Sequence, residues 1–385
     1  MISKKLQPFG TTIFTEMTQL ANRHNAINLA QGFPDFDGPD DLIEEAYQAM
    51  RAGENQYARS MGHPRLVQAI ADKQRRLYGL EYSASEEVVV FCGATEGLAS
   101  SMLGLLNPGD EVILFEPFYD SYPACVALAH ATPRYCTLRY PDFRITEEDL
   151  RPLFNSNTRL LLINTPHNPS GRVFSTEELE LVARLCIEHD VLVLSDEVYE
   201  HLLFDGTPHR SIAALPGMRE RTLCLSSTGK TYSMTGWKVG WATGPRELVA
   251  AAQAAHQFIT FAIATPMQVA MAAAIEKHQE DYFDRFRADY TERRDFLMAA
   301  LESAGFVVCA PQGTYFILAD FRPLFEGTDW EFARQLIEQH QVAAIPPSVF
   351  YRAHPEEGQF LLRFAFCKRM ETLQAAAENL KGLQR

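Results

Sequence analysis

The stretch from residue 159 to residue 196 contains the pattern that decides the fold. Residues 159–164 read RLLLIN, residues 175–189 read STEELELVARLCIEH and residues 191–196 read VLVLSD. The first and third runs are short and apolar, which is typical of strands buried on both faces. Between them, Ser175 followed three residues later by Glu178 forms a capping-box pattern that predicts the start of a helix. The stretch therefore predicts a strand, a helix and a second strand parallel to the first.

The same alternation extends along the chain in both directions. Further elements are predicted as strands at Glu87–Phe91, Glu111–Phe115, Arg134–Leu138 and Thr222–Ser226, and as helices at Glu96–Leu106 and Pro245–His256. Apolar strands that alternate with helices favour an α/β fold with a mainly parallel sheet flanked by helices.

From about residue 275 the pattern becomes that of a smaller α+β unit. A long charged helix is predicted over about His278–Gly305, followed by strands at Gly313–Asp320, Val342–Ile345 and Phe360–Phe366 and a closing helix from Met370. We expect a large domain over residues 45–280 and a small domain made of residues 1–44 together with 281–385. Because no linker-like segment separates these parts, they should form one compact subunit.

Composition excludes several classes of protein. The chain has 385 residues, a net charge of −14 and seven cysteines, none in a CxxC pattern. The negative charge argues against a nucleic-acid partner, since it repels phosphates. Scattered cysteines in odd number indicate neither a disulfide framework nor a metal site of the zinc type. With no signal peptide and no apolar run of transmembrane length, we expect a cytoplasmic protein with no membrane contact.

The stretch from Ser226 to Gly240, SSTGKTYSMTGWKVG, is the first candidate for chemistry. Its small residues around Lys230 let a large flat ligand approach the backbone. A lysine amine can form a Schiff base with an aldehyde, and burial or nearby positive charge lowers its pKa for that purpose. Lys238 can supply positive charge to a phosphate. A lysine after a glycine, taken alone, is more often a solvated loop residue, but the flanking small residues reverse that interpretation.

Asp196 and Tyr199 form the second candidate. Asp196 ends an apolar strand, where open α/β sheets place their ligands. A carboxylate there can keep the nitrogen of a pyridine ring protonated, and Tyr199 can donate a hydrogen bond to the same ring. The alternative for Asp196 is helix capping.

Four weaker signals accompany these two. Asn168 lies in the loop Asn164-Thr165-Pro166-His167-Asn168-Pro169, rigid enough to present an amide, although it could be a structural turn. Arg363 lies inside an apolar strand and suits a carboxylate, although it could form a structural ion pair. Tyr119 could stack on a ring or simply pack in the core. The small-residue turn at Gly93, Ala94 and Thr95 could bind phosphate at a helix start.

Together these segments resemble class I aminotransferases of fold type I, which use pyridoxal phosphate (PLP). The resemblance is strongest to bacterial methionine aminotransferases and to the kynurenine/glutamine transaminase branch, and it runs from Asn28 to Arg363. The order of an aromatic residue, Asn-Pro, Asp-x-x-Tyr, Lys and Arg matches throughout. Many class I members have arginine where this chain has Lys238, but the kynurenine/glutamine branch has lysine there.

The resemblance implies a role for each position. Lys230 is the lysine that binds the cofactor aldehyde and acts as general base, and Asp196 is the partner of the ring nitrogen. Tyr199 and Asn168 would contact the ring hydroxyl, Tyr119 would stack on the ring, and Arg363 would bind the substrate carboxylate with help from the backbone at Gly32. The remaining implied positions are Gly93, Ala94, Thr95, Ser227 and Lys238 around the phosphate, Tyr57 reaching the phosphate from a neighbouring subunit, and Phe14 and Phe261 in the substrate pocket.

The implied reaction consists of two half-reactions. An amino acid displaces Lys230, the freed lysine moves a proton from Cα to the cofactor, and a 2-oxo acid leaves before a second oxo acid reverses the sequence. The pocket of Phe14, Tyr119 and Phe261 is mainly apolar, and no second arginine is evident. Methionine or an aromatic amino acid is therefore favoured over aspartate as substrate. The role of Tyr57 implies a homodimer with shared active sites.

Three alternatives remain open at this level. A kynurenine/glutamine transaminase would use the same residues. A cysteine-S-conjugate β-lyase would use them too, but would release pyruvate and ammonia without an amino acceptor. A regulatory protein could keep this fold without turnover.

Overall fold

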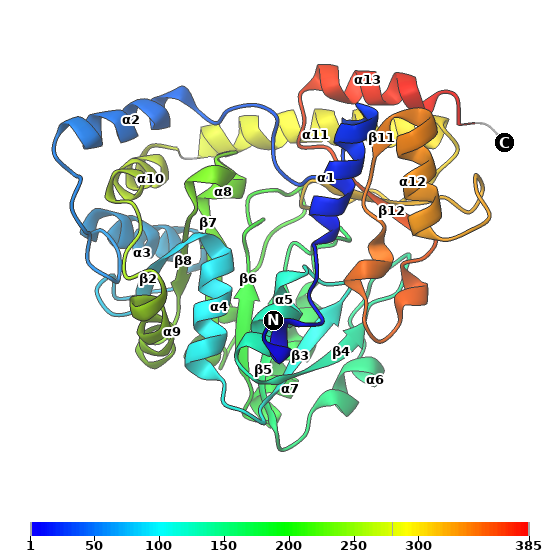
Figure 1. Ribbon diagram of the computed structural model, residues 1–385. Helices are drawn as coiled ribbons and strands as arrows, with labels where there is room; N and C mark the ends of the chain where they lie inside the picture. The colour runs from blue at the N-terminus through cyan, green and yellow to red at the C-terminus, as the bar shows by residue number, and fades with distance from the viewer. Residues whose placement is uncertain (1, 279, 384–385) are drawn as a thin grey trace.

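The computed structural model describes residues 2–278 and 280–383 (Figure 1). Within that part of the chain, a seven-stranded sheet has the order β2-β8-β7-β6-β5-β3-β4. Its strands are β2 (Val88–Cys92), β3 (Glu111–Glu116), β4 (Thr132–Thr137), β5 (Thr158–Asn164), β6 (Leu192–Asp196), β7 (Thr222–Ser227) and β8 (Val239–Thr243). Only β8 runs antiparallel to its described neighbours in this sheet, so the prediction of a mainly parallel sheet is confirmed. The sequence did not predict β8, which is short and contains Gly240.

Alternate side chains of the strands face two layers of helices. Val112 and Leu114 pack against one layer, and Ile113 and Phe115 pack against the other. The first layer contains α4 (Gly93–Leu105), α5 (Ser121–Leu128) and α9 (Arg246–Ile259), and the second contains α7 (Thr176–Glu188). Both hydrogen bonds of the predicted capping box of α7 are present, between Ser175 and Glu178. Burial on both faces explains why the residues of β3 from Val112 to Phe115 are apolar in succession.

A third group of helices packs at the end of the sheet that holds β2 and β8. It consists of α2 (Asp40–Arg51), α3 (Pro64–Tyr78) and α10 (Thr265–Lys277). Leu42 of α2 belongs to the same buried cluster as Val90, Trp241 and Met271. Helix α2 therefore crosses the predicted boundary between residues 44 and 45, and it packs with β2, β8 and α10 of the unit that contains the seven-stranded sheet.

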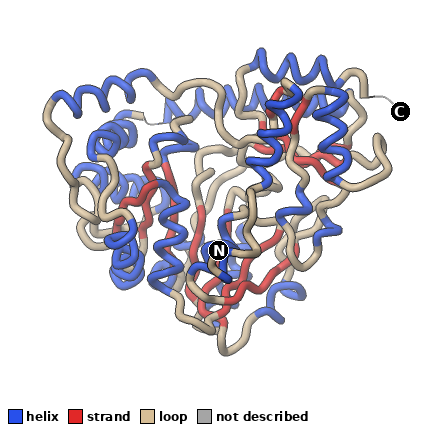
Figure 2. Tube along the Cα trace, in the orientation of Figure 1, coloured by secondary structure: helices blue, strands red, loops and turns tan. Residues whose placement is uncertain are grey.

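The C-terminal segments form a smaller α+β unit, beside which α1 lies in Figures 1 and 2. Its elements are α11 (Glu280–Ser303), β9 (Val307–Val308), β10 (Phe316–Asp320), α12 (Asp329–His340), β11 (Val342–Ala343), β12 (Leu361–Ala365) and α13 (Met370–Leu380). Strand β10 pairs antiparallel with β9 and β12. The predicted long helix is α11; residue 279, inside the predicted range, lies outside the described residues.

The N-terminal segment packs on this smaller unit. Met17 and Ala21 of α1 (Ile13–His24) share a buried cluster with Leu336 of α12, and β1 (Ile27–Asn28) pairs with β11. This packing supports the proposal that residues before about 40 belong with the C-terminal unit; the exact division into 45–280 and 1–44 with 281–385 stays a prediction.

Short elements complete the described chain. They are α6 (Glu147–Leu150), α8 (Thr228–Thr231) and 3-10 turns at Lys4–Leu6, Arg151–Leu153, Ile212–Ala214, Arg219–Arg221, Thr235–Trp237, Pro347–Phe350 and Pro355–Glu357. No described helix combines the length and the apolar character needed to cross a membrane.

Candidate active site

A cavity of about 260 Å³ lies where the C-terminal ends of β2, β5, β6 and β7 meet the smaller unit. This is the edge of an open α/β sheet at which ligands usually bind. The cavity brings together most predicted site residues: Phe14, Gly32, Gly93, Ala94, Thr95, Tyr119, Asn168, Asp196, Tyr199, Ser227, Lys230, Lys238 and Arg363. It is also lined by residues that were not predicted, among them Gln31, Tyr122, Asn164 and Phe316.

Lys230 lies in α8, directly after β7, and its amine faces the cavity. Nζ is 3.4 Å from the carbonyl oxygen of Gly32 and lies 5.9 Å and 5.4 Å from the ring centres of Tyr199 and Tyr315. Burial lowers the pKa of Lys230 to about 8, although the Asp196 carboxylate opposes that shift. This environment differs from that of a solvated loop lysine, because it favours the neutral amine that a nucleophile or base requires.

Asp196 ends β6 and its carboxylate is buried. Oδ2 accepts a hydrogen bond of 2.8 Å from Tyr122 Oη, and Oδ1 accepts one of 3.3 Å from the backbone N–H of Val198. Burial raises the pKa of Asp196 to about 6, while both hydrogen bonds lower it. The bond from Val198 is the local contact that a capping role involves. The bond from Tyr122 comes from α5, so a distant helix also orients this carboxylate.

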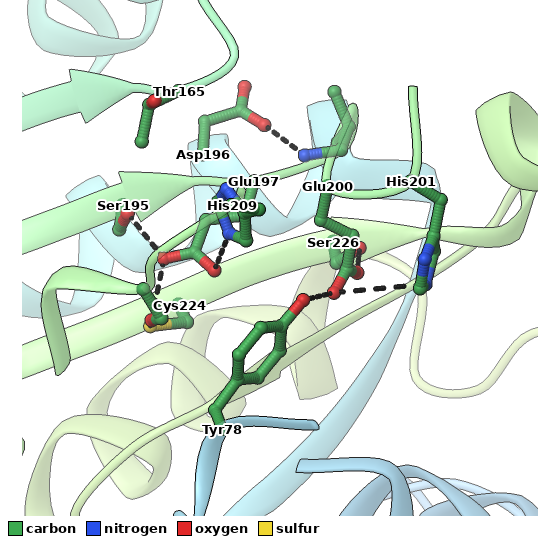
Figure 3. Close-up of polar contacts among 12 residues, drawn as sticks. Tyr78, Thr165, Ser195, Asp196, Glu197, Glu200, His201, His209, Cys224 and Ser226 are labelled. Atoms are coloured by element: carbon green, nitrogen blue, oxygen red, sulfur yellow. Dashed lines mark hydrogen bonds and ion pairs between the residues drawn. The ribbon is translucent and has the colours of Figure 1, made fainter. Parts of the chain in front are cut away.

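Glu197 occupies the reverse side of the Asp196–Tyr199 turn, away from Asp196 (Figure 3). It accepts hydrogen bonds of 2.8 Å from Ser195 Oγ and Ser211 Oγ, and His209 Nε2 lies 3.0 Å from its other oxygen. Each carboxylate oxygen therefore has a polar partner, as a buried charge requires.

Glu200 is the second carboxylate on the reverse side of the turn (Figure 3). It pairs with Lys73 Nζ of α3 at 2.6 Å and accepts hydrogen bonds from Ser226 and Tyr78. Although burial opposes the shift, the Lys73 ammonium group lowers the pKa of Glu200 well below its usual value. A buried ion pair thus ties the turn that carries Asp196 and Tyr199 to helix α3.

The start of α4 forms a cup that suits a phosphate. Gly93 has a φ of +74°, and a Cβ built there would lie 3.0 Å from Lys238 Nζ. A Cβ on Gly240 would lie 2.6 Å from the backbone nitrogen of Ala94. The free N–H groups of a 13-residue helix, the hydroxyl groups of Thr95 and Ser227 and the Lys238 amine therefore share one corner of the cavity. Such a corner stabilises a phosphate dianion.

Arg363, in β12, is buried at the opposite side of the cavity. Its Nη1 and Nη2 atoms donate to Asn168 Oδ1 and to the Ala30 carbonyl oxygen, each at 3.1 Å. These partners are an amide and a peptide oxygen, not the carboxylate of a structural ion pair. The buried Nε atom has no hydrogen-bond partner among the described residues. An unpaired buried donor is costly, and a ligand carboxylate can supply its acceptor.

Asn168 and Tyr119 also face the cavity. The backbone N–H of Asn168 donates to Asn164 Oδ1 at 2.8 Å, and Asn164 Nδ2 donates to the Asp196 carbonyl oxygen at 2.9 Å. Asn164 thus fixes the Asn168 loop to the end of β6. The Tyr119 ring meets the Tyr122 ring edge-on at 5.6 Å, and Tyr119 lines the cavity, which core packing alone does not require.

Tyr57 and Phe261 do not reach the cavity of their own chain. Their rings meet edge-on at 5.3 Å, and the side chains are 83% and 45% exposed. Phe258, which is 86% exposed, lies three residues before Phe261 on α9. The structure of one chain therefore places both predicted residues on an outer apolar surface.

Sequence reasoning missed Tyr122 and Tyr315. Tyr119 lies two residues before α5 begins at Ser121, and Tyr122 lies in the first turn of that helix, so no helical spacing marks the pair; the backbone N–H of Tyr122 donates to the Tyr119 carbonyl oxygen at 2.9 Å. Tyr315 precedes β10, and nothing in its local sequence marks it. Its place at the site depends on how the smaller unit packs against residues 30–32.

Comparison with known proteins agrees with this geometry. The model of the family "Aminotransferase class I and II" matches residues 24–380. A methionine aminotransferase of Escherichia coli is 42% identical over 98% of this chain and 97% of its own length. A human kynurenine–oxoglutarate transaminase 3 is 37% identical over 99% of this chain and 90% of its own. The solved structure of N-succinyldiaminopimelate aminotransferase from Mycobacterium tuberculosis superposes with a TM-score of 0.96, at 43% identity and with all of both chains covered.

The family match covers nearly the whole chain, and the fold-type I architecture predicted from the sequence is confirmed by these likenesses. The chain belongs to the class I and II aminotransferases and is an aminotransferase.

Proposed function

We propose that the protein is a PLP-dependent aminotransferase that moves the amino group of methionine or an aromatic amino acid to a 2-oxo acid by a ping-pong mechanism. The observation that carries the proposal is the grouping of Lys230, Asp196, Tyr119 and Lys238 around one cavity, with Arg363 at its far side. An amine, an anion, an aromatic face and a phosphate cup are the groups that PLP requires.

The residues of the cavity fit the cofactor. Gly93 and Gly240 leave open the space that a Cβ would fill, beside the Lys238 amine. Asp196 would hold the ring nitrogen, Tyr119 the ring face, and Tyr199 with Asn168 the ring hydroxyl. When bound, PLP supplies an electron sink that makes a Cα–H bond acidic.

The chain's own residues then divide the remaining work. Arg363 binds the substrate carboxylate through its free Nε, and Asn168 and the Gly32 backbone hold it in place. Lys230 takes the proton from Cα. With a pKa of about 8, it is part neutral at neutral pH and can act both as base and as acid.

The pocket favours an apolar substrate side chain. Phe14, Tyr119 and Phe316 line it, and its cationic lining residues within the described chain are Lys230, Lys238 and Arg363. Each of these three already has a proposed partner, so no cation is left for a second carboxylate. This supports methionine or an aromatic amino acid over substrates with an acidic side chain. Discrimination within the apolar class is about 1–3 kcal/mol per methylene group, so broad specificity is expected.

Two related activities use the same residues. The human relative is named a kynurenine transaminase, and a kynurenine/glutamine transaminase is as compatible with the pocket as a methionine transaminase. A β-lyase acting on cysteine conjugates would release pyruvate and ammonia without an acceptor. A non-catalytic regulatory role is disfavoured, since Lys230, Asp196 and Arg363 all face one cavity.

We also propose that the protein is a homodimer with shared active sites and that it acts in the cytoplasm. Tyr57, Phe258, Ile259 and Phe261 are exposed apolar side chains. A second copy placed on this surface would cover them, and would bring Tyr57 and Phe261 to the partner's cavity. Large exposed apolar patches commonly mark such interfaces.

The experiment that tests the proposal is a half-reaction. The purified protein is reconstituted with PLP, its visible spectrum is recorded, and L-methionine is added without an acceptor. Loss of the visible band with release of 4-methylthio-2-oxobutanoate is expected. A coloured protein that ignores methionine, but responds to kynurenine, glutamine or a cysteine conjugate, would move the assignment to one of the alternatives. A protein that binds no PLP would refute it.

A further inference from the structure

The carbonyl oxygen of Gly32 is shared by two donors from different parts of the chain. Tyr315 Oη donates to it at 2.5 Å, and Lys230 Nζ donates to it at 3.4 Å. A peptide oxygen has two lone pairs and can accept both hydrogen bonds. The shorter bond is the stronger one, so the tyrosine hydroxyl occupies the better of the two positions.

Gly32 itself has little freedom to move. A Cβ built on it would lie 2.6 Å from Phe316 and 3.2 Å from Tyr315, so both rings pack directly against its Cα. Two residues earlier, the carbonyl oxygen of Ala30 accepts a hydrogen bond of 3.1 Å from Arg363 Nη2. The Gly32 carbonyl is therefore a fixed acceptor.

Tyr315 also shapes the aromatic surroundings of the lysine. Its side chain is fully buried, and its ring meets the Tyr199 ring at 5.3 Å and 89°. Lys230 Nζ lies within 6 Å of both ring centres, at 5.4 Å from Tyr315 and 5.9 Å from Tyr199. A cation at this distance from an aromatic ring is stabilised, more so where water is excluded.

We propose that Tyr315 is a positioning residue for Lys230, because its hydroxyl group holds the Gly32 carbonyl oxygen toward which the free amine points. The proposal rests on the role proposed above for Lys230. In this arrangement the hydroxyl group and the amine share one carbonyl oxygen, and the short bond from the hydroxyl leaves the amine with the longer and weaker of the two bonds. The amine then stays beside the cavity, and its charged form is not stabilised so strongly that it cannot lose its proton.

Removing the hydroxyl group frees the Gly32 carbonyl oxygen for Lys230. The ammonium form gains a stronger acceptor while the ring contact remains, so Tyr315→Phe should raise the pKa of Lys230. The expected rise is roughly half a unit or more, in line with a strengthened hydrogen bond from a charged donor. A residue that only fills space would not produce a directed shift.

The matched control is Tyr290→Phe. Tyr290 is equally buried, its ring lies 6.3 Å from that of Tyr315, and its hydroxyl group contacts Ser233 rather than Gly32. Both variants lose one buried hydroxyl from the same group of rings. Comparing them separates the loss of the Gly32 bond from a general loosening of the packing.

The first measurement needs no turnover. The full-length protein is freed of cofactor and labelled with trace amounts of an amine-reactive anhydride at a series of pH values, and mass spectrometry follows the peptide that contains Lys230. The midpoint of its reactivity should rise in Tyr315→Phe and stay unchanged in Tyr290→Phe. An unchanged midpoint in Tyr315→Phe, or an equal rise in the control, would overturn the proposal.

The second measurement uses the holoenzyme. In single-turnover reactions with methionine, the acid limb of the pH profile for Cα-proton removal should move upward by the same amount in Tyr315→Phe. At pH values below the midpoint the rate then falls roughly threefold for each half unit. If PLP did not bind at all, the proposed function would fail, but the labelling result would still decide whether Tyr315 acts on Lys230.

Discussion

The buried pair of Lys73 and Glu200 provides a quantitative test of how the Asp196–Tyr199 turn is held. The two charges are 2.6 Å apart, and their side chains are 5% and 1% exposed. Lys73→Met leaves the Glu200 carboxylate with hydrogen bonds from Ser226 and Tyr78 but without a counter-charge. Removing one partner of such a pair typically costs about 3–5 kcal/mol of unfolding free energy.

The cost can be converted into a shift of the melting temperature. Unfolding entropy is about 2.1 cal/mol/K per residue, which for 385 residues gives roughly 0.8 kcal/mol/K. The expected loss for Lys73→Met is then about 4–6 °C. Glu200→Gln should also destabilise, because it leaves a buried ammonium group unpaired. The double variant should lose less than the two single variants together, since neither charge remains.

Differential scanning calorimetry and urea unfolding on all three variants measure these losses. The control is Arg75→Met, in the same helix, because Arg75 pairs with Asp72 on the surface with side chains 65% and 45% exposed. An exposed pair of this kind contributes at most about 1 kcal/mol. If Lys73→Met were no more destabilising than the control, or if the double variant lost the sum of the single losses, the buried pair would not hold the turn.

Three further outcomes are expected. The affinity for PLP should fall as the pH drops through about 6, because protonation of Asp196 removes the anion from the ring nitrogen. Tyr122→Phe should move this transition to higher pH, because it removes a hydrogen bond that lowers the pKa of Asp196. Fluorescence titration from about pH 5 to pH 8 measures both effects, and an affinity that stays constant over this range would contradict the role of Asp196. Arg363→Lys should lower kcat/KM for methionine roughly 10- to 100-fold, mainly through KM, because lysine cannot offer the planar pair of donors, and a change of less than about twofold would argue against its role as carboxylate clamp. Lys230→Ala and Tyr57→Ala should each be inactive or impaired alone, but subunit exchange between them should restore one intact site per mixed dimer, whereas no recovery would mean that Tyr57 does not act on a neighbouring chain.

Much of the fold can be predicted from the sequence, because strands buried on both faces appear in it as short runs of consecutive apolar residues. Strands β5 and β6 contain the apolar runs Leu160–Ile163 and Leu192–Leu194, and the capping box at Ser175 marks the start of α7. Strand β8 was not predicted, because its five residues include Gly240 and directly follow the Lys230 segment. The boundary near residue 44 was hard to place because α2 has one apolar face that packs on α10, a contact distant in sequence.

The candidate site divides in the same way. Lys230, Asp196 and Asn168 lie at or shortly after strand ends. Arg363 lies inside the apolar strand β12, where a charged residue is unusual, so all four are visible in the sequence. Tyr122 and Tyr315 act through contacts made across the fold, and a buried tyrosine has no local signature.

The predicted roles of Tyr57 and Phe261 involve a second copy of the chain. Both are exposed side chains on the surface of a single copy. Their roles depend on where a second copy lies, which neither the local sequence nor the fold of one chain determines.

The reversed direction of β8 has a consequence for how the Lys230 segment is held. A parallel strand in that position would begin at the far edge of the sheet, about 17 Å from the cavity, given roughly 3.3 Å per residue over its five residues. Because β8 is antiparallel to β7, the chain leaves the sheet at Ser227 and re-enters it in the neighbouring strand at Val239. The segment that carries Lys230 is therefore a connection whose two ends continue directly into adjacent strands of the same sheet. Lys230 is therefore held by the seven-stranded sheet, whereas Gly32 packs on Tyr315 and Phe316 and Arg363 lies in β12, both on the side of the smaller unit.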